Sequence, residues 1–167
     1  MANALLHGIG AQVSHPDRQV IALAGDGGLA MMLGELLTLT QNKLPVKTIV
    51  VNNSSLNFVE LEMKAAGFVN YGTALDNPSF AAIAEAMGIF ARRVENSEDL
   101  PDAVREVLAH DGPALLDVVT ERQELSMPPA IEAAQVKGFA LYAIRTVMSG
   151  KGDELLDLAR ANWRQFL

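Results

Sequence analysis

Three short apolar segments, each bounded by turn-forming residues, constrain the fold of this chain most. They are residues 19–24 (QVIALA), 46–51 (VKTIVV) and 114–119 (ALLDVV). Apolar runs of this length are typical of strands that are buried on both faces of a parallel sheet. Segments of helical length separate them, so crossover helices should join the successive strands. We therefore predict an α/β fold with a doubly wound, mostly parallel sheet and helices on both faces.

Periodicity and capping residues predict the remaining elements. A further strand is expected at residues 89–94, and Ser79 is a plausible N-cap for the helix that ends before Gly88. The predicted helices span residues 2–13, 29–42, 58–66, 79–87, 97–110, 133–149 and 153–166. The composition changes near Ser126–Pro129. We expect an α/β domain over residues 1–126 and a helical tail over residues 127–167.

Composition excludes several classes of function. The 167 residues carry a net charge of −7 and no cluster of Lys and Arg, which argues against nucleic acid as a partner. The chain has no cysteine, so disulfides and thiolate metal sites are excluded. Its N-terminus lacks the pattern of a signal peptide, and no apolar run approaches the roughly 18–20 residues that span a bilayer. We expect a cytoplasmic protein.

Two polar clusters follow two of the predicted strands. Gly25–Gly28 (GDGG) comes after the first strand and Asn52–Ser55 (NNSS) after the second. Ligands bind at the carboxyl ends of the strands in such sheets, so the clusters converge on one crevice if the two strands are neighbours. Asp26 offers a carboxylate oxygen, Asn53 an amide oxygen and the following loop a carbonyl, which suits half of a Mg²⁺ octahedron. The backbone N–H groups of the glycines would open the next helix toward a diphosphate.

Each of the two motifs, taken alone, is a weak indication of a cofactor site. GDGG alone is more often a tight turn between a strand and a helix, and paired asparagines alone say less. A noncatalytic α/β binding module, in which Asp26 and the asparagines only cap turns, therefore stays open. A nucleotide-binding Rossmann domain is rejected, because GDGGLA does not fit G-x-G-x-x-G and asparagines stand where ribose requires a carboxylate. GDG and NN at two strand ends, separated by residues 28–51, together form the signature of thiamine-diphosphate enzymes.

The flanking segments resemble the C-terminal cofactor-binding domain of the pyruvate oxidase and pyruvate dehydrogenase (quinone) family. The resemblance covers nearly the whole chain. It rests on MANA at the start and on KLPVK (43–47), FVELEMK (58–64), DGPALLDVV (111–119), ELSMPP (124–129), KGFALY (137–142), SGKGDE (149–154) and ANWR (161–164). The chain departs from the family at Asn57, where glycine is usual.

This resemblance implies roles for particular residues. Mg²⁺ would be bound by the side chains of Asp26 and Asn53 and by the carbonyl of Ser55. Phe58 and Glu62 would be catalytic residues near the reacting carbon. The implied cofactor-binding residues are Asp26, Gly27, Gly28, Asn53, Ser54, Ser55, Leu56, Asn57 and Phe58.

The resemblance also implies a larger enzyme. The expected activity is oxidative decarboxylation of pyruvate, with thiamine diphosphate and Mg²⁺ as cofactors and electrons passing through FAD to ubiquinone. The catalytic glutamate and the FAD would belong to N-terminal and flavin domains that this chain lacks, so the chain alone is expected to be inactive. An acetolactate synthase-like carboligase is the alternative within the family.

Assembly and membrane contact follow from the same resemblance. The parent enzyme would be a homo-oligomer, a tetramer in the family. In the tail, Leu155, Leu156, Ala159, Trp163 and Phe166 share one helical face. Such a face suits reversible binding to a membrane surface. The resemblance therefore places the enzyme at the inner face of the cell membrane as a peripheral protein.

Overall fold

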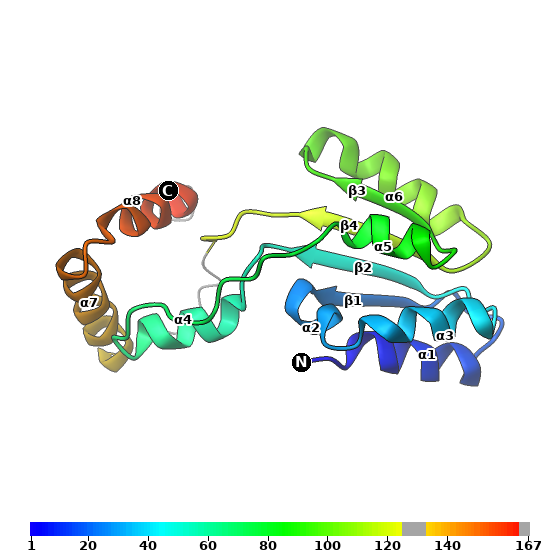
Figure 1. The fold of residues 1–167 in the computed structure, drawn as a ribbon, viewed down its shortest axis with the longest axis horizontal. Helices are drawn as coiled ribbons and strands as arrows, with labels where there is room; N and C mark the ends of the chain where they lie inside the picture. The colour runs from blue at the N-terminus through cyan, green and yellow to red at the C-terminus, as the bar shows by residue number, and fades with distance from the viewer. Residues whose placement is uncertain (125–132, 164–167) are drawn as a thin grey trace. The chain divides into compact units, whose positions relative to one another are not determined.

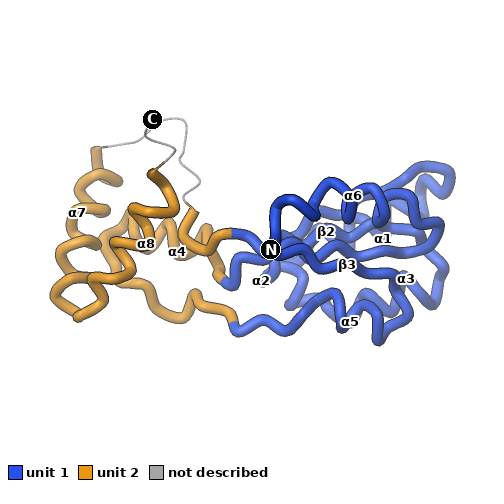
Figure 2. Tube along the Cα trace, turned by 90° about the horizontal axis from the view of Figure 1, so that it is seen from above, with its two compact units in different colours: residues 1–54, 76–120 blue, residues 55–75, 121–167 orange. Residues whose placement is uncertain are grey.

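The computed structural model describes residues 1–124 and 133–163. The chain divides into two compact units, residues 1–54 with 76–120 and residues 55–75 with 121–167 (Figure 2). The second unit combines the segment after the second strand with the tail. A domain boundary at residue 126 stays a prediction, and Ser126–Pro129 lie outside the described residues.

A parallel sheet forms the centre of the first unit. In the described part of the chain it has four strands in the order β1-β2-β4-β3 (Figure 1). Every neighbouring pair is parallel. The strands are β1 (Ile21–Gly25), β2 (Lys47–Asn52), β3 (Phe90–Val94) and β4 (Ala114–Val119). The predicted parallel α/β fold is confirmed.

Helices cover both faces of this sheet. On one face α1 (Ala4–Ser14), α2 (Asp26–Ala30), α3 (Leu36–Gln41) and α5 (Phe80–Ala86) enclose the larger core. On the other face α6 (Leu100–Ala109) packs on the apolar side chains of β3 and β4. Figure 1 shows α1 and α3 on the side of the sheet opposite to α6. The predicted site residues Asp26 and Asn53 directly follow the carboxyl ends of β1 and β2.

The first strand differs from its prediction. β1 was expected to be buried on both faces, but it is an edge strand with Ile21 49% and Leu23 64% exposed. The register pairs Leu23 with Ile49 of β2, so both point to the face that α6 covers. Within the first unit α6 is the helix in the core on that face, and it packs over the opposite edge of the sheet. An apolar run therefore predicted the strand correctly and its burial wrongly.

The helix predicted over residues 29–42 is broken. The structure has α2, a 3₁₀ turn η1 (Leu33–Glu35) and α3 instead. Met32 leaves the helical region with φ −129°, and Gly34, a poor helix former, follows it. Leu36 and Leu39 are fully buried, whereas Leu37 is 42% exposed, so the buried apolar stripe is narrow.

The second unit is helical in its described residues. It contains α4 (Asn57–Ala65), α7 (Ala133–Met148) and α8 (Gly152–Asn162), and α7 packs against both other helices. Gly138 is essential for the α4–α7 contact, because a Cβ there would meet the Ala65 carbonyl oxygen at 1.7 Å. The predicted helical tail is confirmed, whereas Phe166 lies outside the described residues.

Candidate functional site

Asp26 and Asn53 lie at the carboxyl ends of two adjacent strands in the first unit. β1 ends at Gly25, and Asp26 is the next residue. β2 ends at Asn52, and Asn53 follows it. The two strands are parallel and paired through Gly25 and Val51. The condition on which the predicted crevice depends, that these two strands are neighbours, is therefore met.

The Asp26 carboxylate is fixed by two hydrogen bonds. Its side chain belongs to a residue that is only 2% exposed. Oδ1 accepts from the Gly27 backbone N–H at 2.8 Å, and Oδ2 accepts from Asn77 Nδ2 at 2.7 Å. An ionised carboxylate has about four acceptor positions, so each oxygen keeps one for a metal ion. A hard, oriented oxygen donor at a strand end fits Mg²⁺.

Gly25 leaves space at the end of β1, but the short helix that follows supplies only a small dipole. A Cβ on Gly25 would meet no atom within 4 Å, so the end of β1 is open. The Gly27 N–H, which we expected to face a diphosphate, donates to Asp26. Because α2 has only five residues, its dipole is smaller than the predicted 14-residue helix would have supplied.

A line of hydrogen-bonded polar groups, with Asn77 half-buried and Asn52 and Asp117 buried, connects Asp26 to the centre of the sheet. Asn77 Nδ2 donates to Asp26 and, at 3.0 Å, to Asn52 Oδ1. Asn52 Nδ2 donates to Asp117 Oδ1 at 3.0 Å. Arg93 and the Phe80 N–H both donate to Asp117 Oδ2, at 2.6 and 3.2 Å. The sequence analysis missed this network, although a carboxylate inside the apolar segment ALLDVV was a signal, because a buried charge needs partners.

The loop after β2 supplies the remaining predicted cofactor-binding residues. Ser54 has φ +54°, a left-handed conformation that is uncommon outside glycine. Ser55 begins the second unit, where it is buried and its hydroxyl donates to Glu60 at 2.8 Å. Leu56 precedes α4, and Asn57 opens α4 with its side chain bonded to the Glu124 carbonyl at 3.2 Å. Asn57 does not have a positive φ, so this backbone does not require the glycine usual in the family.

The two predicted catalytic residues lie one helical turn apart on α4. Phe58 is 74% exposed, and Glu62 is exposed as well. Positions four residues apart share a helix face, so both side chains are available on one side of α4. The structure thus leaves both residues accessible, and their catalytic role stays a prediction.

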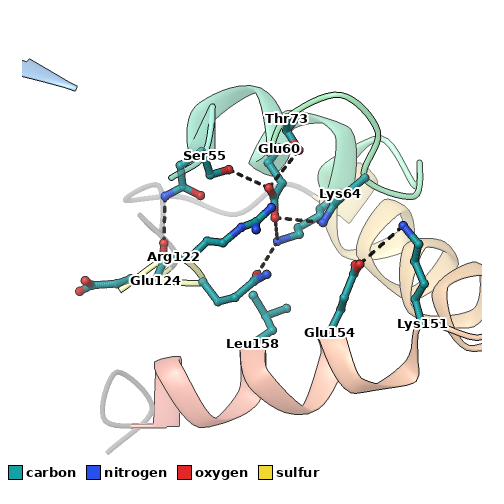
Figure 3. Close-up of polar contacts among 12 residues, drawn as sticks. Ser55, Glu60, Lys64, Thr73, Arg122, Glu124, Lys151, Glu154 and Leu158 are labelled. Atoms are coloured by element: carbon teal, nitrogen blue, oxygen red, sulfur yellow. Dashed lines mark hydrogen bonds and ion pairs between the residues drawn. The ribbon is translucent and has the colours of Figure 1, made fainter. Parts of the chain in front are cut away.

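The opposite face of α4 holds a buried charge pair that the sequence analysis assigned no role. Glu60 binds Lys64 at 2.8 Å and accepts hydrogen bonds from Ser55 and Thr73, as Figure 3 shows, and from Asn70. Lys64 also donates to Gln123 at 3.0 Å. These bonds tie α4 to the segments that flank it within the second unit. Their role is structural, since they consume the acceptor capacity of Glu60.

A cavity of about 800 Å³ also lies in the second unit. It is lined by residues 70–74 and 121–123, by Lys151 and by residues of α8. Its charges include the pairs Lys151–Glu154 at 3.6 Å and Arg160–Asp157 at 3.7 Å. None of the predicted site residues lines it, and paired charges do not favour a diphosphate. We therefore do not assign the cofactor to this cavity.

The described residues contain no group of three or more His, Cys, Asp or Glu side chains that could hold a metal ion. The other donors predicted from the sequence, Asn53 and the loop carbonyl, are an amide oxygen and a carbonyl oxygen.

The parallel sheet, with Gly25–Gly28 and Asn52–Asn53 at adjacent strand ends, defines an α/β domain of the thiamine-diphosphate-binding class. Residues 1–118 match the family model described as thiamine pyrophosphate enzyme, C-terminal TPP binding domain. This chain belongs to that family. Thiamine diphosphate is accordingly its cofactor, with Mg²⁺, the ion that is standard for the family.

The known proteins that are similar to this chain carry several different names. The putative thiamine pyrophosphate-containing protein YdaP of Bacillus subtilis is 35% identical over 158 residues, which is 95% of this chain and 27% of YdaP. The acetolactate synthase large subunit of Porphyra purpurea is 34% identical over 146 residues, 84% of this chain and 25% of that protein. The chain therefore spans about a quarter of the length of these relatives.

A solved structure shows the same fold. The thiamine diphosphate-dependent 4-hydroxybenzoylformate decarboxylase of Rhodococcus jostii RHA1 superposes with a TM-score of 0.68 at 32% identity, over 72% of this chain and 23% of that one. These comparisons establish the family domain. They do not single out the pyruvate oxidase branch that the sequence resemblance predicted, because acetolactate synthases recur among the relatives.

Proposed function

We propose that this chain is the domain that holds Mg²⁺ and the diphosphate of thiamine diphosphate in a larger enzyme that decarboxylates a 2-oxo acid. One observation carries the proposal: the buried Asp26 carboxylate, with one acceptor position left on each oxygen, lies at the end of β1 beside the end of β2. When bound, thiamine diphosphate supplies the electron sink that allows a 2-oxo acid to lose CO₂.

The residues of this chain would bind and orient the cofactor. Asp26 and Asn53 would hold the metal ion through side-chain oxygens, and Ser55 through its carbonyl. The metal ion would then neutralise the diphosphate, which the net charge of −7 otherwise repels. Gly27, Gly28 and residues 54–58 would line the cofactor.

Carbon–carbon bond formation is the favoured outcome of the reaction. Acetolactate synthases are named for a product that joins the acyl group of one decarboxylated 2-oxo acid to a second 2-oxo acid, and such enzymes recur among the relatives. The similar solved structure is a decarboxylase. A 2-oxo acid such as pyruvate is thus the proposed substrate class.

Oxidation of pyruvate through FAD to a quinone is the second candidate function, and the surface of the tail favours it. Along α7 the apolar side chains Val136, Ile144 and Val147 are exposed, and so are Leu156 on α8 and Trp163 directly after it. Exposed apolar helix faces of this kind suit the surface of a membrane. The alignment with YdaP covers 95% of the chain and so must include part of this tail.

No helix in the described part of the chain is long and apolar enough to cross a bilayer. In the second candidate the tail would therefore bind at the membrane surface, on the cytoplasmic side, and the enzyme would assemble as a homo-oligomer with its flavin and N-terminal domains.

Phe58 and Glu62 are proposed to meet the reacting carbon in either case. Their shared exposed face on α4 would be covered by substrate, by cofactor or by another domain of the enzyme. Replacing Phe58 by Ala or Glu62 by Gln should lower turnover without weakening Mg²⁺ binding, because neither is a proposed metal ligand.

The proposal is tested by Asp26→Ala in the complete enzyme that carries this chain. Cofactor affinity should fall by more than about 100-fold, since even the outer partners of metal ligands contribute roughly 10–100-fold. Asp17→Ala, which removes an exposed loop carboxylate, is the matched control and should bind normally. Unchanged affinity in Asp26→Ala would refute the metal site.

Product analysis with pyruvate separates the two candidate functions. Acetolactate would support the carboligase. Acetate formed together with a reduced electron acceptor would support the oxidase.

A further inference from the structure

Asn77 lies in the segment that leads into α5, and its side chain reaches two residues from different strands. Nδ2 donates to Asp26 Oδ2 at 2.7 Å and to Asn52 Oδ1 at 3.0 Å. All three residues belong to the first unit. The amide thus bridges the ends of β1 and β2 beside the proposed metal ligand.

The orientations of both amides are dictated by the carboxylates at the two ends of this line. A carboxylate can only accept, so Asn77 must turn its nitrogen toward Asp26. Asn52 must likewise turn its nitrogen toward Asp117, which leaves its oxygen facing Asn77. Flipping either amide would place two acceptors against each other. The network therefore has one stable arrangement.

Asp117 anchors the far end of the line. It is completely buried and bonded to Asn52, to the Phe80 N–H and to Arg93. Asn52 is 3% exposed, and its backbone carbonyl accepts a hydrogen bond from the Thr120 N–H at 2.9 Å. Since these partners are held by β2, β4 and α5, Asn77 is positioned by the sheet itself.

We propose that Asn77 is a positioning residue that holds the Asp26 carboxylate in the orientation required for Mg²⁺. Gly27 fixes one carboxylate oxygen and Asn77 the other, so the carboxylate plane cannot rotate. The acceptor position left on each oxygen then points in a fixed direction. Partners that orient metal ligands in this way typically contribute about 10–100-fold to metal affinity. This inference rests on the proposed function of Asp26.

The test measures Mg²⁺ affinity by titration of the complete enzyme at saturating thiamine diphosphate. Asn77→Leu removes both hydrogen bonds at similar volume, and Asn77→Ala serves if the leucine variant does not fold. Either should weaken Mg²⁺ binding by about 10–100-fold, while turnover at saturating Mg²⁺ and cofactor changes much less. That split distinguishes positioning of a ligand from a loss of the catalytic machinery.

Ser79→Ala is the matched control. Ser79 lies two residues after Asn77, and its hydroxyl accepts the N-cap hydrogen bond from the Ala82 N–H. The substitution therefore weakens the same segment without removing a contact to Asp26. Normal Mg²⁺ affinity in this control beside weakened affinity in the Asn77 variants supports the proposal. Equal loss in both, or unchanged affinity in the Asn77 variants, overturns it. If Asp26→Ala binds Mg²⁺ normally, the proposed function fails instead.

Discussion

Glu60 and Lys64 carry opposite charges one helical turn apart on α4, and at most 2% of either side chain is exposed. Taking both charges out of water costs several kcal/mol for each ion unless hydrogen bonds satisfy them, a requirement that Ser55, Asn70, Thr73 and Gln123 help to meet. A buried pair of this kind adds little net stability over an apolar pair, but breaking it leaves a charge without compensation.

Replacing Lys64 by Met should therefore lower the free energy of unfolding by about 3–5 kcal/mol. The Glu60→Leu, Lys64→Met double variant should recover part of that loss, because no buried charge remains although Ser55, Asn70 and Thr73 lose their acceptor. Urea denaturation monitored by circular dichroism measures the free energy of unfolding of both variants. A double variant that is as unstable as Lys64→Met would show that the loss comes from packing rather than from charge.

Acid should weaken the same network. Burial raises the pKa of Glu60, but the hydrogen bonds from Lys64, Ser55 and Thr73 and the charge of Lys64 outweigh it, so the pKa lies below its ordinary value. A carboxylate with a depressed folded pKa contributes stability above its ordinary pKa and loses it as the pH falls through the folded value. Unfolding free energy should thus decline as the pH falls below the ordinary glutamate pKa of about 4.3. In Glu60→Gln this decline should be shallower, and an identical decline in both proteins would exclude Glu60 as its source.

Sequence motifs could place Asp26 and Asn53 at the ends of two strands, because a strand end is marked by residues close to it in the sequence. They could not locate Asn77, which lies 51 residues from Asp26 and meets it only after the sheet has formed. Glu60 and Glu62 are two residues apart on one helix, yet one is fully buried and the other exposed. The helical period alone cannot say which face of α4 packs against the rest of the second unit.

The helix with clear start and stop residues in the sequence was predicted best. Ser79 caps α5 and Gly88, with φ +77°, ends it, as the sequence indicated. The helix after β1 breaks at Met32, which has φ −129°, beside Gly34, a poor helix former that the apolar pattern does not take into account. The exposed face of β1 could not be predicted, since an apolar run states what a strand can bury and not what covers it.

Two glycines of α1 offer a matched pair of element-scale substitutions. Gly10 faces open space, so Gly10→Ala should raise the free energy of unfolding by about 0.5–1 kcal/mol through helix propensity. A Cβ on Gly8 would meet Ala22 Cβ at 3.1 Å and Val46 Cγ1 at 3.3 Å, both in the core under α1. Gly8→Ala should therefore be destabilising by about 1–3 kcal/mol. Thermal or urea denaturation checks the signs, and stabilisation by both substitutions would mean that α1 can move away from the sheet without cost.

At the scale of the whole molecule, the structure has two units that are interleaved along the chain. Residues 55–75 belong to the same unit as the tail, and the first unit resumes at Asp76. Linear composition cannot show such an excursion. It does show the net charge, which bears on how the molecule can hold an anionic cofactor.

Removal of the metal ion should abolish cofactor binding, because the charge of this chain is −7 and the diphosphate is also negative. Repulsion of this kind is screened beyond the Debye length, about 10 Å at 0.1 M salt, but a monovalent salt cannot replace a cation bound between Asp26 and the diphosphate. In the complete enzyme, thiamine diphosphate with Mg²⁺ at about 100 times its Kd should stabilise the fold by about 2.7 kcal/mol. The melting temperature should rise accordingly with Mg²⁺ present and stay unchanged when EDTA replaces it. Asp26→Ala should remove the response to Mg²⁺ in the same assay. Equal stabilisation in EDTA would mean that backbone N–H groups or basic side chains hold the diphosphate without a metal ion.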